Sequence, residues 1–340
     1  MKFGVFDHLD DDGSPLGALY ESRLQLIEAY ERIGIYCYHL AEHHSTPLGM
    51  SPSPSVFLAS VAQRTKRLRF GPLVYTLSFY NPLRLAEEIC MLDHLSEGRF
   101  QLGIGRGISP IENLFYGVDP KLSQARYLET YQVLMKALTS KTLSHHGEFH
   151  RFDDVPMKMT PSQRPHPPLW YGVANPESVG WVAANKVNTV SLGPAAPVRA
   201  ITDRYRAEWA RLGNDPSAQP LMGLGRHVVI AETDAEALTI AKRAYRLWHA
   251  SFHYLWDHHN RIGVRPTYGL YPESLDELIA RGQAAVGSPA TVRAMLQKQT
   301  AEAGVNYLLL DLAFGDLTQR EVMRSVELFA KQVMPGFEAG

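Results

Sequence analysis

The chain has 340 residues, of which 45% are hydrophobic and 20% are charged, and its formal net charge is -1. This is the composition of an ordinary globular protein, and a near-zero charge without a basic stripe argues against nucleic acid as a partner. No apolar run is long enough to span a membrane, and the N-terminus lacks a signal-peptide pattern, so we expect a cytoplasmic protein with no membrane segment.

Short apolar runs alternate with longer amphipathic ones along the chain. The short runs predict eight strands, at 2–6, 36–41, 68–76, 100–105, 169–173, 189–192, 224–231 and 307–312. Helices are predicted between them, at 19–33, 53–65, 82–96, 123–138, 176–185, 197–212, 234–256, 289–303 and 318–333. Such alternation implies parallel strands joined by right-handed crossovers. Eight units fit a closed (β/α)8 barrel of the TIM type, and a doubly wound open sheet is the alternative.

Two segments interrupt this alternation. Residues 145–152 precede a proline-rich stretch and predict a small hairpin, within an insertion at about 140–168. Residues 257–286 contain several glycines and prolines and predict a long mobile loop before the last strand and helix, which would cover the barrel mouth. We therefore predict a single barrel domain over 1–340 with these two insertions.

The run Ala41-Glu42-His43-His44 is the strongest functional signal, because it lies where a predicted strand ends and a loop begins. Active sites of α/β barrels are built from the carboxyl ends of the strands. Histidine also exchanges protons near neutral pH, which suits general acid or base catalysis. The alternative is that both imidazoles cap the strand and face water.

Other predicted strand ends carry further candidates for binding. Glycines in Gly103-Ile104-Gly105-Arg106-Gly107 let the backbone approach a flat or anionic ligand, and the arginine suits phosphate. The alternative is a tight turn with a solvated arginine. Asn175-Pro176 is predicted to begin a helix whose free N–H groups bind phosphate, with a plain capped helix as the alternative. The same rule selects Asp7, His8, Tyr75, Thr76, Ser178 and Phe314.

Histidine pairs elsewhere do not predict a metal site. His249 and His253 lie one helical turn apart, and the pairs at 145–146 and 258–259 are adjacent in the chain. None of them has the acidic partner of an H-E-x-x-H motif, and the chain contains neither a P-loop nor a G-x-S-x-G elbow. We therefore expect no metal ion.

Taken together, these motifs resemble the bacterial luciferase-like family of flavin-dependent monooxygenases. The resemblance spans the whole chain, and its specificity comes from the set rather than from any one piece. The matching segments are Met1 to Gly4, Glu42-His43-His44, Asn81-Pro82, Ala86-Glu87-Glu88, Leu92 to Phe100, Gly103 to Gly107, Val286 to Val292 and Glu327 to Pro335.

The resemblance implies a barrel that binds FMN at the carboxyl ends of its strands. Reduced FMN would come from a separate reductase and react with O2 to oxidise a small or medium apolar substrate, an aldehyde or ketone. The resemblance implies His43 as the catalytic histidine. Glu42 is expected to orient or tune it, with a structural salt bridge at the strand end as the alternative. Flavin contacts are implied for Leu73, Val74, Tyr75, Gly105, Arg106, Gly107, Ala174, Asn175 and Ser178, and the peptide bond 73–74 falls where relatives carry a non-prolyl cis bond. The expected substrate pocket contains Phe6, His44, Phe79 and Phe314.

Some features of the family leave alternatives open. Light-emitting members carry a reactive cysteine where this chain has Gly105, so a non-luminescent enzyme is expected. Other relatives use the deazaflavin F420, which makes a hydride-transfer oxidoreductase the second hypothesis. A third is a non-catalytic subunit that binds flavin and supports a catalytic chain. Relatives are often dimers, so we expect a homodimer.

Overall fold

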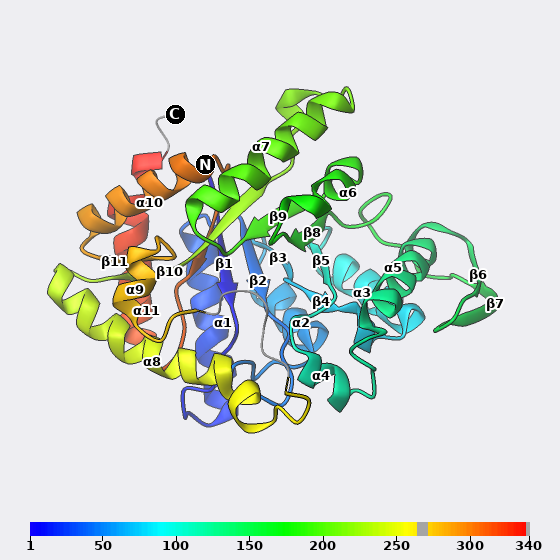
Figure 1. Ribbon diagram of the computed structural model, residues 1–340, viewed down its shortest axis with the longest axis horizontal. Helices are drawn as coiled ribbons and strands as arrows, with labels where there is room; N and C mark the ends of the chain where they lie inside the picture. The colour runs from blue at the N-terminus through cyan, green and yellow to red at the C-terminus, as the bar shows by residue number, and fades with distance from the viewer. Residues whose placement is uncertain (264–270, 338–340) are drawn as a thin grey trace.

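Strands and helices alternate along the chain as predicted (Figure 1), in a computed structural model that describes residues 1–263 and 271–337. The strands are β1 (Lys2–Asp7), β2 (Cys37–Leu40), β3 (Arg69–Pro72), β4 (Tyr75–Thr76), β5 (Leu102–Gly105), β6 (Thr142–His146), β7 (Arg151–Pro156), β8 (Leu169–Gly172), β9 (Asn188–Ser191), β10 (Met222–Ile230), β11 (Ala284–Gly287) and β12 (Tyr307–Asp311). The α-helices are α1 (Leu16–Arg32), α2 (Pro54–Arg64), α3 (Pro82–Leu95), α4 (Pro110–Phe115), α5 (Ser123–Thr139), α6 (Val179–Ala184), α7 (Ala195–Arg211), α8 (Asp234–His258), α9 (Leu275–Ala280), α10 (Pro289–Ala303) and α11 (Gln319–Leu328). Short 3₁₀ or π turns are η1 (Leu77–Phe79), η2 (Pro176–Ser178), η3 (Pro216–Ala218), η4 (Phe329–Val333) and η5 (Met334–Phe337).

The strands form a nearly closed barrel. Neighbours follow the order β3-β2-β1-β12-β10-β9-β8-β5-β4, and each of these pairs is parallel. The backbones of Phe70 in β3 and Phe100 just before β5 form a further parallel bridge, which joins the first strand of this order to the chain that enters β5. The predicted barrel is therefore confirmed, and the open doubly wound sheet is not what forms.

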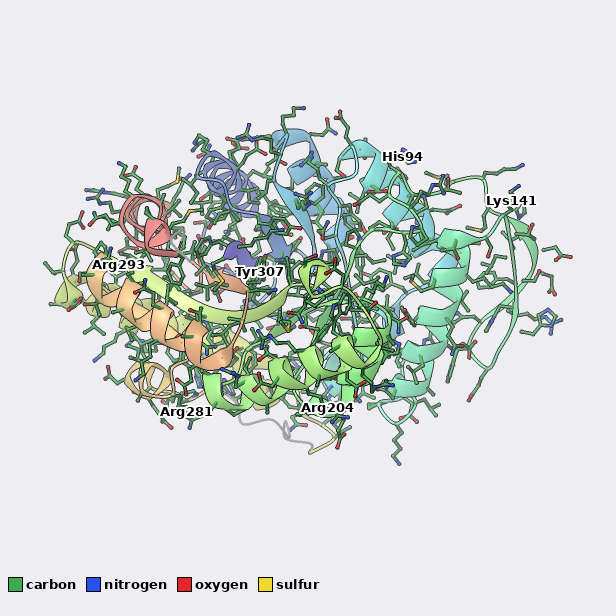
Figure 2. The ribbon with its side chains drawn as sticks, turned by 90° about the horizontal axis from the view of Figure 1, so that it is seen from above. His94, Lys141, Arg204, Arg281, Arg293 and Tyr307 are labelled. Atoms are coloured by element: carbon green, nitrogen blue, oxygen red, sulfur yellow. The ribbon has the colours of Figure 1, made fainter. Side chains whose placement is uncertain are left out.

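Aromatic and polar side chains fill the half of the barrel where the strands begin. Tyr307 of β12 lies near the centre in the view from above (Figure 2), and its hydroxyl is 2.9 Å from Nε2 of the buried His39. The indole N–H of Trp170 donates to Oε1 of Gln101 at 2.9 Å. Gly4 makes room for the tyrosine, because a Cβ there would lie 1.6 Å from its hydroxyl oxygen. The interior of this half of the barrel is therefore filled by side chains.

The segment 257–286 contains more regular structure than the predicted loop. Helix α8 continues to His258, α9 covers Leu275–Ala280, and β11 pairs in parallel with the last four residues of β10. The strand β11 is only four residues long, so its apolar run gave too weak a pattern to be recognised. Residues 264–270 of the predicted mobile loop lie outside the described residues, and the mobility of the loop stays a prediction.

The first insertion contains the predicted hairpin. Strands β6 and β7 pair antiparallel and project from the side of the barrel beyond α5 (Figure 1). A helix that the sequence analysis missed, α4, follows β5 and is capped by Ser109, whose Oγ accepts the N–H of Glu112 at 3.3 Å. The Ser-Pro pair at its start is the same signal that predicted α2. The single domain over 1–340 stays a prediction.

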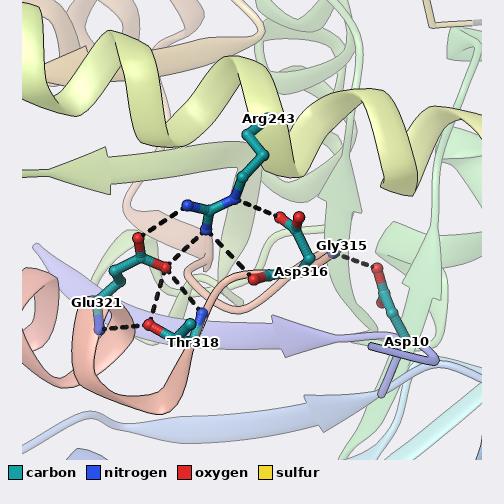
Figure 3. A network of polar contacts seen from close by, with 6 residues as sticks. All are labelled: Asp10, Arg243, Gly315, Asp316, Thr318 and Glu321. Carbon is teal, nitrogen blue, oxygen red and sulfur yellow. Dashed lines mark hydrogen bonds and ion pairs between the residues drawn. The ribbon is translucent and has the colours of Figure 1, made fainter. Parts of the chain in front are cut away.

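The loop after β12 is held by an ionic network (Figure 3). Arg243 of α8 donates from Nε to Asp316 at 3.0 Å and from Nη2 to Glu321 at 2.8 Å. Glu321 also forms a capping box with Thr318 at the start of α11. These contacts join α8, the loop and α11, so the loop has a fixed position at the barrel mouth.

On its other side the same loop contacts the end of β1. Oδ2 of the buried Asp10 accepts the N–H of Gly315 at 2.6 Å, and its Oδ1 has no hydrogen-bond partner among the described residues (Figure 3). Burial raises the pKa of Asp10 to about 7, although the Gly315 hydrogen bond and the charge of Arg23 act in the opposite direction. Ionised Asp10 is therefore costly to keep in the folded protein.

We predict that Asp10→Asn makes stability less sensitive to rising pH. The folded protein binds the Asp10 proton more tightly than the unfolded chain, whose pKa is 3.8. The stability contribution is therefore fully present below 3.8 and falls by about 1.4 kcal/mol for each pH unit up to about 7. Asparagine keeps the acceptor and has no charge to bury. Urea unfolding near pH 5 and pH 8 should show the variant gaining on the wild type at the higher pH, and parallel curves would contradict the prediction.

Candidate active site

Glu42 links three segments at the carboxyl ends of the strands. Its Oε1 accepts from Nε2 of His44 at 2.8 Å, and its Oε2 accepts from the Thr76 N–H at 3.1 Å and the Tyr80 hydroxyl at 2.9 Å. Burial raises the pKa of Glu42, and the hydrogen bond from His44 acts against that rise. The carboxylate thus joins β2 to β4 and η1, and it contacts His44 rather than His43.

His44 is held on both of its ring nitrogens. With Nε2 donating to Glu42, Nδ1 accepts from the Tyr116 hydroxyl at 2.7 Å. Its ring packs edge-on against Phe79 and Tyr116, which stack on each other with ring centroids 4.6 Å apart. Because both ring nitrogens are engaged, His44 is not available for proton exchange and instead holds Glu42 and Tyr116 in place.

His43 has a different environment, although it adjoins His44 in the chain. Its Nδ1 is 3.4 Å from Oε1 of the buried Glu112, and the same oxygen accepts the His44 backbone N–H at 2.7 Å. Its ring stacks on that of His8, with centroids 5.7 Å apart, and 14% of its side chain is exposed. With Nδ1 facing Glu112, Nε2 is the nitrogen left for proton exchange. Sequence reasoning missed Glu112 because it missed α4.

The peptide bond between Leu73 and Val74 is cis, as the resemblance implied. It separates β3 from β4, so the strand predicted at 68–76 is two short strands. Gly105 lies beside it, and a Cβ there would be 2.4 Å from a methyl carbon of Val74. This glycine therefore lets β5 approach the chain at 73–74, in addition to any approach of a ligand. Tyr75 is fully buried and its hydroxyl lies 2.7 Å from Oγ of Ser55, so only its backbone is available at the mouth.

Arg106 and the loop after β8 emerge from neighbouring strands. Arg106 is exposed, and its charge opposes the burial that raises the pKa of Tyr171 in β8. No acidic side chain among residues 1–263 and 271–337 forms an ion pair with its guanidinium. The predicted helix at 176–185 begins as the turn η2, where Oδ1 of Asn175 accepts the Glu177 N–H at 3.1 Å and Oγ of Ser178 donates to the Asn175 carbonyl at 3.4 Å. Gly107 and Ala174 lie on these same two loops.

The expected substrate pocket divides into two places. His44 and Phe79 belong to the cluster with Tyr116, whereas Phe6 and Phe314 lie at a second group of side chains. Phe6 lines a small cavity of about 10 Å³, and Phe314 packs on one of its lining residues. The lining consists of Phe6, His8, Leu192, Gly225, Arg226, His227, Tyr271, Gln283, Leu309 and Asp311.

Buried ionisable side chains meet at this cavity. His227 of β10 and Asp311 of β12 are register partners on adjacent strands, with Nε2 to Oδ2 at 3.4 Å. Phe314 packs on the His227 ring at a centroid distance of 4.9 Å. Sequence reasoning selected His8 and Phe314 but missed His227 and Asp311, although an aspartate at the end of the last barrel strand was a usable signal.

Within residues 1–263 and 271–337, no group of three or more His, Cys, Asp or Glu side chains has the geometry of a metal site. The imidazole rings of His249 and His253 contact each other at a tilt, with their centroids 4.0 Å apart. In the same ranges no helix is long and apolar enough to cross a membrane.

The barrel mouth thus combines His43 and Glu112 with a cis peptide bond and an exposed arginine. Comparison with known proteins shows which family has this sequence. The sequence model of the luciferase-like monooxygenases matches residues 1–307. The chain belongs to the luciferase-like monooxygenase family. The resemblance found in the sequence is thereby confirmed.

Individual relatives of this luciferase-like chain cover most of its length. It is 46% identical to an uncharacterized protein of Sinorhizobium fredii over 93% of this chain and 92% of that protein. It is 27% identical to the oxygenase component of the flavin-dependent trigonelline monooxygenase of Acinetobacter baylyi, over 71% of this chain and 68% of that protein. Among solved structures, monooxygenase RslO1 of Streptomyces bottropensis superimposes with a TM-score of 0.87 and 26% identity, over 99% of this chain and 100% of that chain.

Proposed function

We propose that this luciferase-like protein is a flavin-dependent monooxygenase that uses reduced FMN and O2 to oxidise a small or medium apolar aldehyde or ketone. The position of His43 carries the proposal, because its ring lies between the Glu112 carboxylate and His8, which lines the cavity. A proton-exchanging group therefore lies next to a lining residue of this cavity, at the barrel end that serves catalysis in this fold.

The residues at the neighbouring strand ends fit FMN. Arg106 is exposed and has no acidic partner in the part of the chain that the structure describes, which suits a phosphate, and it follows the strand next to β8, whose loop carries Asn175 and Ser178. We assign the phosphate to these three residues. We assign the flavin ring to the backbone beside the cis bond and its neighbours, namely Leu73, Val74, Tyr75, Gly105, Gly107 and Ala174. Bound reduced FMN would supply the electrons that activate O2.

The protein's own groups provide proton transfer and exclusion of water. Nε2 of His43 donates or accepts the proton that the oxidation requires, while Glu112 fixes the direction of the ring through Nδ1. Glu42 acts indirectly, because it holds His44, the neighbour of His43 in the chain. Phe6 lines the cavity and Phe314 packs on His227, and we assign to these aromatic side chains the exclusion of water from the reacting atoms.

Oxygen uptake by the purified chain tests the proposal. Chemically reduced FMN and an apolar ketone or aldehyde should give substrate-dependent O2 consumption and an oxygenated product. Reduced F420 in parallel should give neither. Substrate reduction by F420 without O2 uptake would support the hydride-transfer alternative, and no activity by the chain alone would support a non-catalytic subunit.

Two partners belong to this proposal. The A. baylyi relative is an oxygenase component, which supports a separate reductase as the source of reduced FMN. The homodimer stays a prediction, and Val56 of α2 with Met91 and Leu95 of α3 are exposed apolar side chains that such an interface would bury.

We predict that Arg106→Ala weakens the binding of FMN by about ten- to a hundredfold, because a charge-assisted pair with phosphate is lost. Riboflavin lacks the phosphate, so its affinity should change little. Fluorescence titration of both flavins measures the two constants, and Arg151→Ala on the distant hairpin is the matched control. Equal losses for FMN and riboflavin would place Arg106 away from the phosphate.

A further inference from the structure

A second cavity lies where β1, β2 and β3 begin, at the end of the barrel opposite to His43. Its volume is about 320 Å³, which reaches the range of small-molecule sites in proteins, about 300–1,000 Å³. Its walls come from the start of β1, the end of α1 with the turn to β2, the chain that enters β3, and η5. Nothing in the proposed oxidation uses this cavity.

Three cations and one acid line the cavity. The cations are Lys2, Arg67 and Arg69, and the acid is Glu31. Within the described segments, no carboxylate forms an ion pair with any of these three cations. Three positive charges and one negative charge leave the lining with two net positive charges.

Glu31 is engaged by the backbone of the turn before β3. Its Oε2 accepts the N–H groups of Lys66, Arg67 and Leu68 at 2.8, 2.7 and 2.9 Å. Burial acts against the ionised carboxyl, but these hydrogen bonds and the charge of Arg67 hold the pKa of Glu31 below its usual value. The carboxylate therefore fixes the turn that carries the two arginines, and it leaves the surplus of positive charge in place.

Two of the cations gather at one aromatic ring. Nζ of Lys2 is 4.3 Å from the centroid of the Tyr36 ring, and Cζ of Arg69 is 4.9 Å from the same centroid. Contacts of this kind hold the ends of two flexible side chains beside the cavity. Burial, and then the charge of Arg69, lowers the pKa of Lys2, because like charges this close repel each other. A bound anion would turn this repulsion into attraction.

The number of charges decides which anion fits. A phosphate monoester carries about two negative charges near neutral pH, which matches the net charge of the lining, whereas a monocarboxylate carries one. Guanidinium groups suit phosphate oxygens through paired N–H donors, and a lysine adds a point charge. Phe3, Leu68 and Met334 also line the cavity, and they offer apolar surface to the organic part of a ligand.

We propose that this cavity binds a small organic phosphate. Lys2, Arg67 and Arg69 contact the phosphate group, and the apolar walls contact the organic part. This is a second ligand site, at the opposite end of the strands from the site proposed for FMN. It does not depend on the proposed monooxygenase function.

Methionine signals provide a local test of binding to the wild-type chain. The protein is labelled with 13C at the methionine methyl groups and titrated with phenyl phosphate in a phosphate-free buffer. Met334 lines the cavity, so its signal, identified by its loss in Met334→Leu, should show a saturable shift. Met50 follows β2 at the other end of the barrel, and its signal should stay in place.

Three further probes separate the parts of the ligand. Benzoate carries one charge, phenol carries none, and inorganic phosphate lacks the ring. Each should bind at least about tenfold more weakly than phenyl phosphate, judged by the Met334 signal. Benzoate binding as tightly as phenyl phosphate would overturn the choice of a dianion. Inorganic phosphate binding as tightly would overturn the assignment of the apolar walls to an organic part.

Single-charge variants test which side chains hold the phosphate. Lys2→Ala and Arg69→Ala should each weaken phenyl phosphate binding by about tenfold, and Arg69→Glu should abolish it. Both side chains are exposed, so the variants are expected to fold. Lys66→Ala is the matched control, because it removes the same charge from an exposed neighbouring position that does not line the cavity. Its affinity should equal that of the wild type.

Three results would overturn the proposal. One is the absence of a saturable Met334 shift in the wild type. Another is a loss of affinity in Lys66→Ala as large as in Lys2→Ala, which would indicate general attraction to a basic surface. The third is unchanged affinity in Arg69→Glu. None of these titrations uses flavin or O2, so they can fail while FMN-dependent O2 uptake persists, and the reverse also holds.

Discussion

Replacing His43 with alanine should lower coupled substrate oxidation by about 10²- to 10⁴-fold, the usual contribution of a positioned general acid or base. The loss follows because Nδ1 of His43 faces Glu112, which leaves Nε2 for proton exchange, and the ring stacks on His8, which lines the cavity. FMN binding should remain, since the proposed phosphate contacts lie on other strands. Product formation per molecule of O2 consumed, measured with reduced FMN in excess, gives the decrease.

His146→Ala is a suitable control for this experiment. His146 is an exposed histidine on the β6–β7 hairpin, away from the barrel mouth, so its removal should change neither flavin binding nor product yield. If His43→Ala binds FMN normally and also retains full coupled oxidation, the assignment of proton transfer to His43 is wrong. A Glu112→Gln variant should show a smaller decrease with an altered pH profile, because it keeps the shape beside Nδ1 and loses the charge.

The second large effect concerns stability rather than rate. Glu42→Ala should lower the free energy of unfolding by about 3–5 kcal/mol, the range for removing one partner of a buried, hydrogen-bonded charged group. Its carboxylate accepts from His44, Thr76 and Tyr80, and all three donors would be left inside the protein without it. Urea unfolding at neutral pH measures the change.

Glu87→Ala provides the comparison for the stability experiment. Glu87 lies on the exposed face of α3, where loss of a carboxylate is expected to stay within about 0.5 kcal/mol. If Glu42→Ala lowers the free energy of unfolding as little as Glu87→Ala does, water replaces the carboxylate as the acceptor for the three donors, and the prediction is wrong. Asp10 and Glu42 thus have opposite expected outcomes, because Asp10→Asn removes a poorly compensated carboxyl and Glu42→Ala removes one that accepts three hydrogen bonds.

The glycine-rich run at 103–107 shows how one sequence signal can have two structural causes. The sequence predicts a place where the backbone approaches a ligand. In the structure, Gly105 lets β5 approach Val74 beside the cis bond, and Arg106 next to it is exposed. Periodicity cannot separate these causes, because both favour a residue without a side chain.

The sequence by itself determined the eight-unit alternation, the family, and the strand end that carries Glu42, His43 and His44, because these depend on local periodicity and on motifs contiguous in the chain. The tertiary structure decided which partner each of these side chains meets. Glu42 binds His44 instead of His43, Glu112 comes from an unpredicted helix, and Asp311 joins His8 and His227 from three different strands. Such contacts depend on how the closed barrel brings the ends of its strands together. The number of residues between two side chains in the sequence does not predict how far apart they lie in the barrel.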